Sequence, residues 1–203
     1  MADAGVAARK RSNDPQAMRR RLLDVAAGAF QADGYHSTST HDIMRVAGVT
    51  GGALHHHFPT KKTLGLAVIR ERVAEAVRET WIEPLRAAPT ARQGILAVFM
   101  QTAAALDARG RVLGCPVNNL AIELSLADGD FQRALQDVFA EWQAAIAQKL
   151  RADQSAGLRM NADPEEMAAF IVAAFSGAMA LAKARQSTEP LKIGARQLLA
   201  LLT

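Results

Sequence analysis

The spacing of the apolar residues constrains the fold of this chain more than any other feature. After Pro15, apolar side chains recur at positions i, i+3, i+4, i+7 and i+8, as the series Leu22, Val25, Ala26, Ala29 and Phe30. This spacing places them on one face of an α-helix. No stretch keeps for long the period of two that a half-buried strand requires, and no internal repeat period appears. We therefore predict an all-α protein.

Glycine, proline and capping residues divide the chain into about nine predicted helices. Gly34 ends the helix that starts at Pro15, and Ser39 with Asp42 three residues later marks the next start as a variant capping box. The remaining helices are predicted at about 39–47, 50–57, 60–83, 90–108, 116–127, 130–152, 164–186 and 190–202. Residues 1–14 are small and polar around Arg9-Lys10-Arg11, which predicts a disordered basic tail.

The composition suits closely packed helices in a reducing compartment. Half of the 203 residues are hydrophobic, only 5% are aromatic, and alanine is abundant. The single cysteine, Cys115, excludes an internal disulfide framework. The N-terminus lacks the apolar core of a signal peptide, and Ser176 and Gly177 interrupt the longest apolar stretch, which is shorter than the roughly 18–20 residues of a membrane span. We expect a soluble cytoplasmic protein that does not enter the membrane.

The positive charge is concentrated at the N-terminal end. Residues 1–62 hold nine Lys and Arg against five Asp and Glu, whereas residues 63–203 hold fifteen of each. All five histidines also lie in the first part, at His36, His41 and 55–57. This asymmetry indicates a polyanionic partner, although a solvated basic tail would account for the charge equally well.

Two short predicted helices meet at a Gly-Val turn, which is the helix-turn-helix pattern. Ile43, Ala47, Val49 and Leu54 are apolar where the two helices must pack against each other. Gly48 lies at the turn, where glycine adopts a positive φ most easily. Many helical hairpins share this arrangement, so the pattern alone indicates DNA binding without establishing it.

A helical wheel separates the inner and outer faces of the second short helix, residues 50–57. Leu54 and Phe58 lie together on the inner face, and Gly52 and His56 lie almost opposite them. Small residues such as Ala53 allow a close approach to base edges, and imidazole N–H groups donate to phosphates. We expect phosphate contacts from Thr38, Ser39, His55, His56 and Lys61, and contacts close to the bases from His41, Thr50, Gly52 and Ala53.

The three adjacent histidines, residues 55–57, admit other interpretations. A metal site is disfavoured because the imidazoles fan out by about 100° each, and no Cys, Asp or Glu stands three or four residues away. Acid–base catalysis is disfavoured because no carboxylate partner is near. An all-helical enzyme, a protein that binds partners other than DNA, and histidines that merely decorate a solvated helix remain the alternatives.

The segment TSTHDIMRVAGVTGGALHHHFPTKKTLGLAVI closely resembles the N-terminal domain of the tetracycline-repressor (TetR) family of transcriptional regulators. The matching features are a Thr/Ser pair before D-I, A-G-V at the turn, G-A-L-x-H-H-F in the recognition helix, and P-T-K opening the next helix. The resemblance covers about residues 16–70.

This resemblance implies a homodimer that binds a palindromic double-stranded operator and is released by a small-molecule inducer. It implies a DNA-binding domain at residues 15–62, a ligand-binding and dimerisation domain at 63–203, and a linking helix at 60–83. It implies neither enzymatic activity nor a cofactor. The chain departs from the family at His55, where tyrosine is usual, and at Gly51, where lysine is common. Because histidine titrates near pH 6.5, we predict that operator affinity rises as the pH falls from 8 to 6.

Cys115 directly precedes Pro116, a favoured first helical residue, and so is expected at a helix N-cap. The helix dipole at such a position favours the thiolate form, which would suit a sensor of oxidants or electrophiles. A lone cysteine is more often a small buried apolar residue, and both interpretations remain open.

The remaining expectations concern the C-terminal part. Large apolar side chains and a few polar ones form a candidate ligand pocket, although core packing explains them equally well: Trp81, Phe99, Met100, Asn118, Asn119, Glu123, Phe139, Trp142 and Phe170. The predicted helix 164–186 is apolar nearly all round, so a monomer would expose too much of it. We expect it to form the dimer interface through Phe170, Phe175, Gly177 and Met179.

Overall fold

The computed structural model describes residues 14–157 and 163–202, which form nine helices once the linking helix is counted as one rod. The first part comprises α1 (Pro15–Asp33), α2 (Thr40–Ala47) and α3 (Gly51–His57). The linking rod is built from α4 (Lys61–Ala67), η1 (Val68–Val73), α5 (Ala74–Val77), η2 (Arg78–Ile82) and α6 (Glu83–Ala87). The rest comprises α7 (Ala91–Arg109), α8 (Pro116–Leu124), α9 (Gly129–Ser155), α10 (Pro164–Arg185) and α11 (Glu189–Leu201). The all-α prediction is confirmed; the tail predicted at 1–14 lies outside the described residues except Asp14.

Side chains that cap helix N-termini set the boundaries much as the sequence predicts. Ser39 caps α2 by accepting a hydrogen bond from the Asp42 backbone N–H at 3.0 Å. Thr60 and Thr63 form a reciprocal capping box at the start of α4. Each cap satisfies backbone donors that the first helical turn would otherwise leave unpaired. The predicted helix start at Ser39 is therefore confirmed.

The linking rod is longer than predicted, because it continues through Pro84 to Ala87. A proline inside a helix lacks the N–H donor and crowds the carbonyl four residues earlier. Here the turn before Pro84 is the π-helical segment η2, whose wider hydrogen-bonding pattern accommodates the proline. The predicted end near Glu83 is wrong for this reason.

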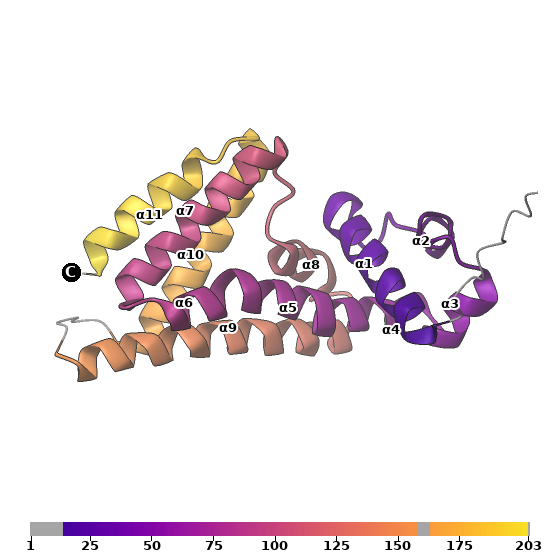
Figure 1. Cartoon of the computed structure of the whole chain (residues 1–203), viewed down its shortest axis with the longest axis horizontal. Helices are drawn as coiled ribbons and strands as arrows, with labels where there is room; N and C mark the ends of the chain where they lie inside the picture. The colour runs from indigo at the N-terminus through magenta and orange to yellow at the C-terminus, as the bar shows by residue number, and fades with distance from the viewer. Residues whose placement is uncertain (1–13, 158–162, 203) are drawn as a thin grey trace, which may run out of the picture.

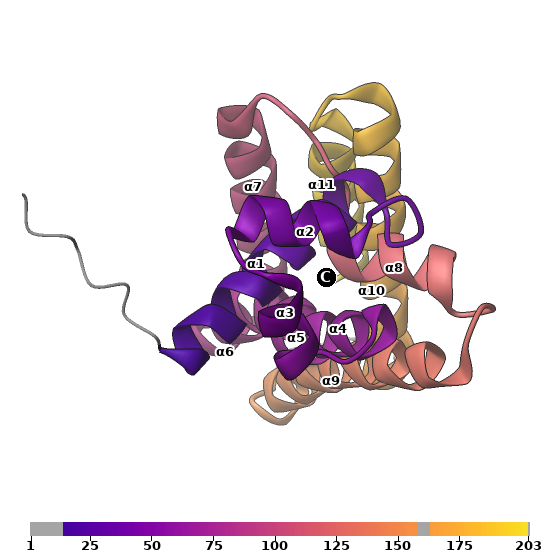
Figure 2. The same ribbon diagram turned by 90° about the vertical axis from the view of Figure 1, so that its right-hand side faces the viewer.

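The helices form two lobes that share the linking rod (Figure 1). α1 packs against the start of the rod and against α2, and α2 packs on α3. Leu22, Leu23 and Phe30 of α1 are buried in this lobe. Seen end-on in Figure 2, these helices form the face of the molecule opposite α11. Ion pairs from α1 to the rod, Arg19–Glu71 and Arg72–Asp24, join this lobe to the linker.

The second lobe is a helical bundle around an aromatic core. α9 runs along the rod, and α10 packs on both α9 and α11 (Figure 1). Trp81 of the rod lies 4.9 Å from Phe175 of α10 and 5.1 Å from Trp142 of α9, between ring centroids. These aromatic contacts bring the three helices together at one point.

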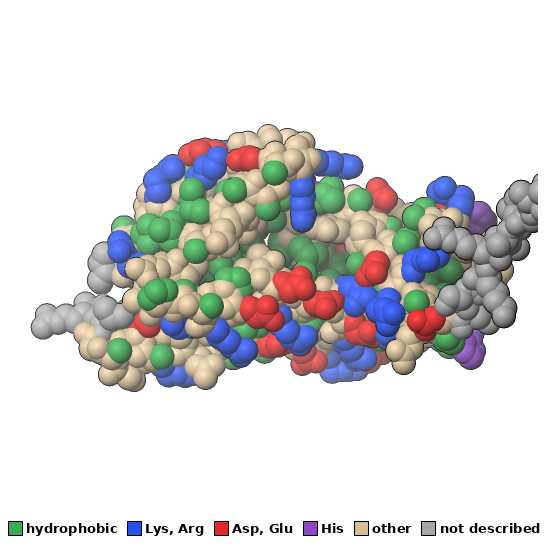
Figure 3. All heavy atoms as spheres, viewed as in Figure 1, with side chains coloured by type: hydrophobic (Ala, Val, Ile, Leu, Met, Phe, Trp, Pro, Cys, Tyr) green, Lys and Arg blue, Asp and Glu red, His purple; other side chains and the backbone are tan. Residues whose placement is uncertain are grey.

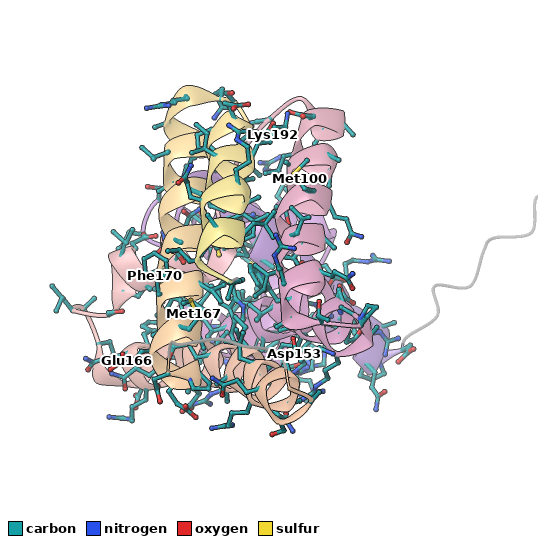
Figure 4. All side chains as sticks on the ribbon, turned by 90° about the vertical axis from the view of Figure 1, so that its left-hand side faces the viewer. Met100, Asp153, Glu166, Met167, Phe170 and Lys192 are labelled. Atoms are coloured by element: carbon teal, nitrogen blue, oxygen red, sulfur yellow. The ribbon has the colours of Figure 1, made fainter. Side chains whose placement is uncertain are left out.

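One side of α10 and α11 presents apolar side chains outward. Phe170 and Leu181 on α10 and Ile193 on α11 are each between 41% and 50% exposed, and Figure 4 shows Phe170 beside Met167 on this face. By length and mean hydropathy α10 could cross a membrane, whereas the sequence analysis expected its apolar stretch to be too short for a membrane span. In the fold it packs on α9 and α11, so its apolar surface is divided between the core and this outer face.

Candidate nucleic-acid interface and ligand cavity

The turn between α2 and α3 has the backbone conformation that a helix-turn-helix requires. Gly48 adopts the left-handed conformation, with φ 65° and ψ 37°, and ends α2. The backbone N–H of Val49 donates to the Met44 carbonyl at 3.1 Å, which closes the last turn. Thr50 then caps α3 by accepting from the Ala53 N–H. Glycine adopts this φ without the steric cost of a Cβ, which explains its position at the turn.

The outward face of α3 carries small residues followed by imidazoles. Leu54 and Phe58 are buried, as the helical wheel predicts, whereas Gly51, His55 and His56 are exposed. Figure 3 shows histidine side chains at this end of the molecule, with Lys and Arg side chains nearby. The His56 and His57 rings lie 5.2 Å apart in an edge-on arrangement. This end of the molecule can donate hydrogen bonds to an anionic surface.

Most of the other residues expected at DNA are also accessible, but three are engaged within the protein. His41, Thr50 and Gly52 are exposed, and Ala53 is half-buried. Thr38 is buried, and its hydroxyl donates to the Gly34 carbonyl at 2.7 Å. The expectation that the Thr38 side chain faces a phosphate is therefore wrong in this conformation.

Lys61 and Ser39 are engaged within the protein as well. The Lys61 ammonium lies 4.5 Å from the Tyr35 ring centroid and donates to the His36 carbonyl at 3.3 Å. Burial lowers the pKa of this ammonium. The Ser39 hydroxyl is exposed but donates to the Asp42 carboxylate at 2.6 Å. Arg45 on α2 is exposed, and its ion pair to Asp42 is loose, so it is a further candidate for a phosphate contact that was not predicted. A basic side chain within one turn of Gly48 is the feature of the sequence that could have indicated it.

A cavity of about 420 Å³ lies in the second lobe, beside the linking rod. The rod contributes Trp81 and Pro84, α9 contributes Trp142, and α8 begins at its wall with Pro116. This volume falls in the range of small-molecule sites. The full lining is Gln31, Ala76, Val77, Glu79, Thr80, Trp81, Pro84, Val98, Gln101, Thr102, Ala105, Leu106, Arg109, Gly114, Cys115, Pro116, Trp142, Phe175 and Met179.

Of the nine residues expected at the pocket, only Trp81 and Trp142 line it. Phe99 is fully buried in the aromatic core, and Phe139 stacks on Trp142 from outside the cavity. Met100 and Phe170 are exposed on the outer helices instead (Figure 4). These placements differ from the expectation because a helix has several faces, and residue type alone does not say which one meets the cavity.

The polar candidates on α8 also lie elsewhere. Asn118 does not line the cavity, and the Asn119 amide donates to the Leu113 carbonyl at 2.8 Å, which fixes the loop before α8. Glu123 accepts backbone hydrogen bonds from Tyr35 and His36 in the first lobe. Asn119 and Glu123 therefore hold backbone segments in place, and none of the three residues contributes to the cavity.

Most polar side chains at the cavity come from residues outside the predicted pocket set. Gln31 reaches it from α1, and Gln101, Thr102 and Arg109 from α7. Thr102 Oγ1 and the two indole Nε1 atoms of Trp81 and Trp142 are buried, and no partner for them exists among the described residues. No sequence motif marks these positions, because their grouping depends on how α1 and α7 are placed around the rod.

Cys115 is the N-cap residue of α8, as expected, but its environment is not that of a thiolate. Its side chain makes no capping hydrogen bond and is 5% exposed at the cavity wall. Burial raises the pKa of the thiol to about 11. The expected lowering of its pKa by the helix dipole is therefore wrong, because desolvation of the thiolate outweighs the dipole. Redox sensing by this residue stays an untested prediction.

The residues expected at the dimer interface separate into two pairs. Phe170 and Gly177 face outward from α10 and are exposed. Phe175 and Met179 are buried and line the cavity, so their assignment to the interface is wrong. The four residues occupy opposite sides of one helix that is apolar nearly all round.

The exposed recognition-type helix, the helix-turn-helix geometry and a second lobe with a partly open cavity define a DNA-binding transcriptional regulator. Residues 22–68 match the family model of the bacterial regulatory proteins of the TetR family. Residues 91–197 match the model described as the C-terminal domain of LmrA/YxaF-like transcriptional regulators. The chain belongs to the TetR family, with a C-terminal domain of the LmrA/YxaF type.

Individual relatives agree with this assignment. The chain is 28% identical to the regulator LmrA of Bacillus subtilis over 134 residues, which are 66% of this chain and 71% of LmrA. It is 26% identical to the transcriptional repressor DhaR of a Mycobacterium species over 178 residues, which are 86% of each chain. The crystal structure of a TetR regulatory protein from Rhodobacter sphaeroides superposes with a TM-score of 0.83 at 25% identity, covering 92% of this chain and 99% of that one. These relatives confirm the prediction of a regulator that is not an enzyme.

Proposed function

We propose that this protein is a homodimeric repressor that leaves a palindromic operator when a small molecule fills the cavity beside the linking rod. One observation carries the proposal: the same rod begins directly after the recognition helix and forms a wall of the cavity through Glu79, Thr80 and Trp81. A ligand that moves this wall changes the position of the DNA-binding lobe. One relative, DhaR, is a transcriptional repressor, which supports repression and not activation as the proposed role.

In this proposal α3 enters the major groove. Gly51, Gly52 and Ala53 allow the helix to approach base edges, and His55 and His56 donate to phosphates beside them. Thr50 and His41 are exposed on the same side, and Arg45 adds a charged contact that no internal partner holds tightly. The side chains of Ser39 and Lys61 would have to leave their internal partners to reach DNA.

Dimerisation is proposed through the outer face of α10 and α11. Phe170, Leu181 and Ile193 expose apolar surface there, and Gly177 of α10 lets a partner helix come close. Figure 4 labels Phe170 on this face. An isologous four-helix contact would cover this face and set the separation of the two recognition helices. Two half-sites in the operator must match that separation, about one helical turn of DNA or more.

Selection of bound DNA from a random pool tests whether the protein binds a palindromic operator. We expect a palindromic sequence whose affinity falls steeply with salt, because phosphate contacts release counterions.

Release of DNA by a ligand in the cavity can be tested by fluorescence, since both tryptophans of the chain, Trp81 and Trp142, line the cavity. Compounds that quench their emission and also release the selected DNA are inducers. Failure to enrich any DNA would contradict the proposed function.

A further inference from the structure

Glu123, near the end of α8, holds the backbone of the turn between α1 and α2. Its two carboxylate oxygens accept hydrogen bonds from the backbone N–H groups of Tyr35 at 2.8 Å and His36 at 2.6 Å. The turn is built closely around this carboxylate: Gly34 has φ +89°, and a Cβ there would lie 3.1 Å from Glu123 Oε2. A residue of the second lobe thus fixes the segment that leads into α2.

The other end of α8 lies at the cavity and touches the same helix of the DNA-binding lobe. Cys115 and Pro116 line the cavity at the start of α8. Next to them, the Gln31 side-chain amide of α1 donates to the Gly114 carbonyl at 3.1 Å. Because α8 is a single helix about 13 Å long, movement of its first turn displaces Glu123 as well. Figure 1 shows α8 between α1 and the rest of the second lobe.

The contact between α8 and α1 is not fully packed. A second cavity, of about 120 Å³, lies between α1, the rod and α8, and it shares Gln31, Ala76 and Pro116 with the larger one. Closely packed interfaces resist sliding, whereas an interface with free volume permits a small shift of one helix. α8 therefore has room to move relative to α1.

The turn is held from its other side by the linking rod. Lys61, at the start of α4, donates to the His36 carbonyl at 3.3 Å, and its ammonium lies over the Tyr35 ring. Glu123 and Lys61 thus hold the N–H and the carbonyl of the same residue from two different elements. A shift of either element changes the position of residues 34–39, which precede α2.

We propose that Glu123 is a positioning residue that transmits occupancy of the cavity to the DNA-binding lobe. A ligand displaces the Cys115–Pro116 end of α8, the helix moves as a unit, and the Glu123 carboxylate moves the backbone of Tyr35 and His36 with it. The start of α2, and α3 behind it, then leave the orientation that the operator requires. This inference rests on the proposed function and assigns the route by which the cavity regulates DNA binding.

A double-mutant cycle tests the assignment without an identified ligand. Thr102→Phe places a ring in the cavity as a substitute for a ligand, and it removes a hydroxyl that has no partner among the described residues. We expect Thr102→Phe to raise the Kd for the selected operator about tenfold when Glu123 is present, within the usual range of coupling between sites. In the Glu123→Ala background we expect the same substitution to change the Kd less than about twofold, because the connection is missing.

Three controls separate positioning from a general loss of structure. Glu123→Gln keeps one acceptor oxygen and should retain part of the coupling. Glu83→Ala removes an exposed carboxylate from α6 and should leave the full effect of Thr102→Phe. Hydrogen exchange at the Tyr35 and His36 amides, measured without DNA, should be faster in Glu123→Ala and in Thr102→Phe but unchanged in Glu83→Ala. If Thr102→Phe does not fold, Ala105→Phe at the same cavity replaces it.

The outcomes distinguish this inference from the proposed function. Equal weakening of operator binding by the cavity substitution with and without Glu123 would overturn the role of Glu123. A cavity substitution that alters neither operator binding nor exchange at Tyr35 and His36 would overturn the route altogether. If the wild-type protein binds no selected DNA, the proposed function fails, and the exchange measurements still decide whether α8 connects the cavity to the turn.

Discussion

Single residues in this protein have effects that depend on their backbone conformation, and two glycines show the contrast. Gly48 has a positive φ at the helix-turn-helix turn, with open space around the position of a Cβ. Gly28, inside α1, also has open space but has an ordinary helical φ. The effect of adding a methyl group at either position therefore comes from the backbone conformation and not from crowding.

Gly48→Ala should lower the free energy of unfolding by about 1 kcal/mol, because alanine is strained in the left-handed region. Gly28→Ala should raise it by about 0.5–1 kcal/mol, because alanine loses less entropy in a helix. Thermal unfolding of the two variants beside the wild type measures both effects as shifts of a few degrees in opposite directions. Shifts in the same direction would contradict this account.

Cys115 should react slowly with thiol reagents in the folded protein. Its pKa of about 11 lies above the value of an unfolded cysteine, so the folded state favours the protonated thiol. The contribution of the buried, protonated thiol to the free energy of unfolding is therefore complete below the unfolded pKa and is lost as the pH rises through the folded pKa. At pH 8 we expect alkylation roughly a hundredfold slower than in denaturant, since each pKa unit is a factor of ten. Comparable rates in both conditions would restore the thiolate hypothesis.

At the scale of elements, α3 combines a buried inner face with an outer face of small residues and imidazoles. Imidazole in general changes its charge between pH 8 and 6, and a protonated imidazole binds phosphate more strongly than a neutral one. We expect operator affinity to rise over this range at constant salt, and the rise to be smaller in His55→Tyr, which carries the residue usual in the family. The same pH profile for both proteins would assign the effect to other groups.

The two faces of α10 serve different purposes in the fold. Phe175 and Met179 face the cavity and core, while Phe170 and Gly177 face outward. Gly177→Glu should therefore leave the fold intact and produce monomers, because it places a charge on the proposed dimer face. Light scattering measures the mass, with Ala140→Glu, exposed on α9, as the control. A dimeric Gly177→Glu variant with normal operator affinity would place the interface elsewhere.

At the scale of the whole molecule, the linking rod connects the DNA-binding lobe to the cavity. Ion pairs join it to α9, from Lys62 to Asp128 and Asp130 at its start and from Arg78 to Glu141 farther along. These contacts connect the rod to α9, so we expect a change in the cavity wall to reach α4. α8 provides a second connection, through Glu123, to a different part of the same lobe.

The sequence by itself determined the elements and the family. Period-3.6 apolar faces, N-cap residues such as Ser39 and Thr60, and the Gly48 turn are local features that the chain specifies within a few residues. The DNA-binding motif lies in one continuous segment, so its spacing could be recognised directly. The inward positions of Leu54 and Phe58 followed from the same periodicity.

Only the tertiary structure decided which side chains meet across helices. Thr38 is buried against Gly34, Phe175 and Met179 face inward, and Glu123 reaches the α1–α2 turn, 87 residues away in the sequence from His36. Cys115 likewise changes from a candidate thiolate to a buried thiol once its neighbours are in place. The physical reason is that burial and pairing depend on the relative placement of helices, whereas caps and periodicity depend on the chain within one or two turns.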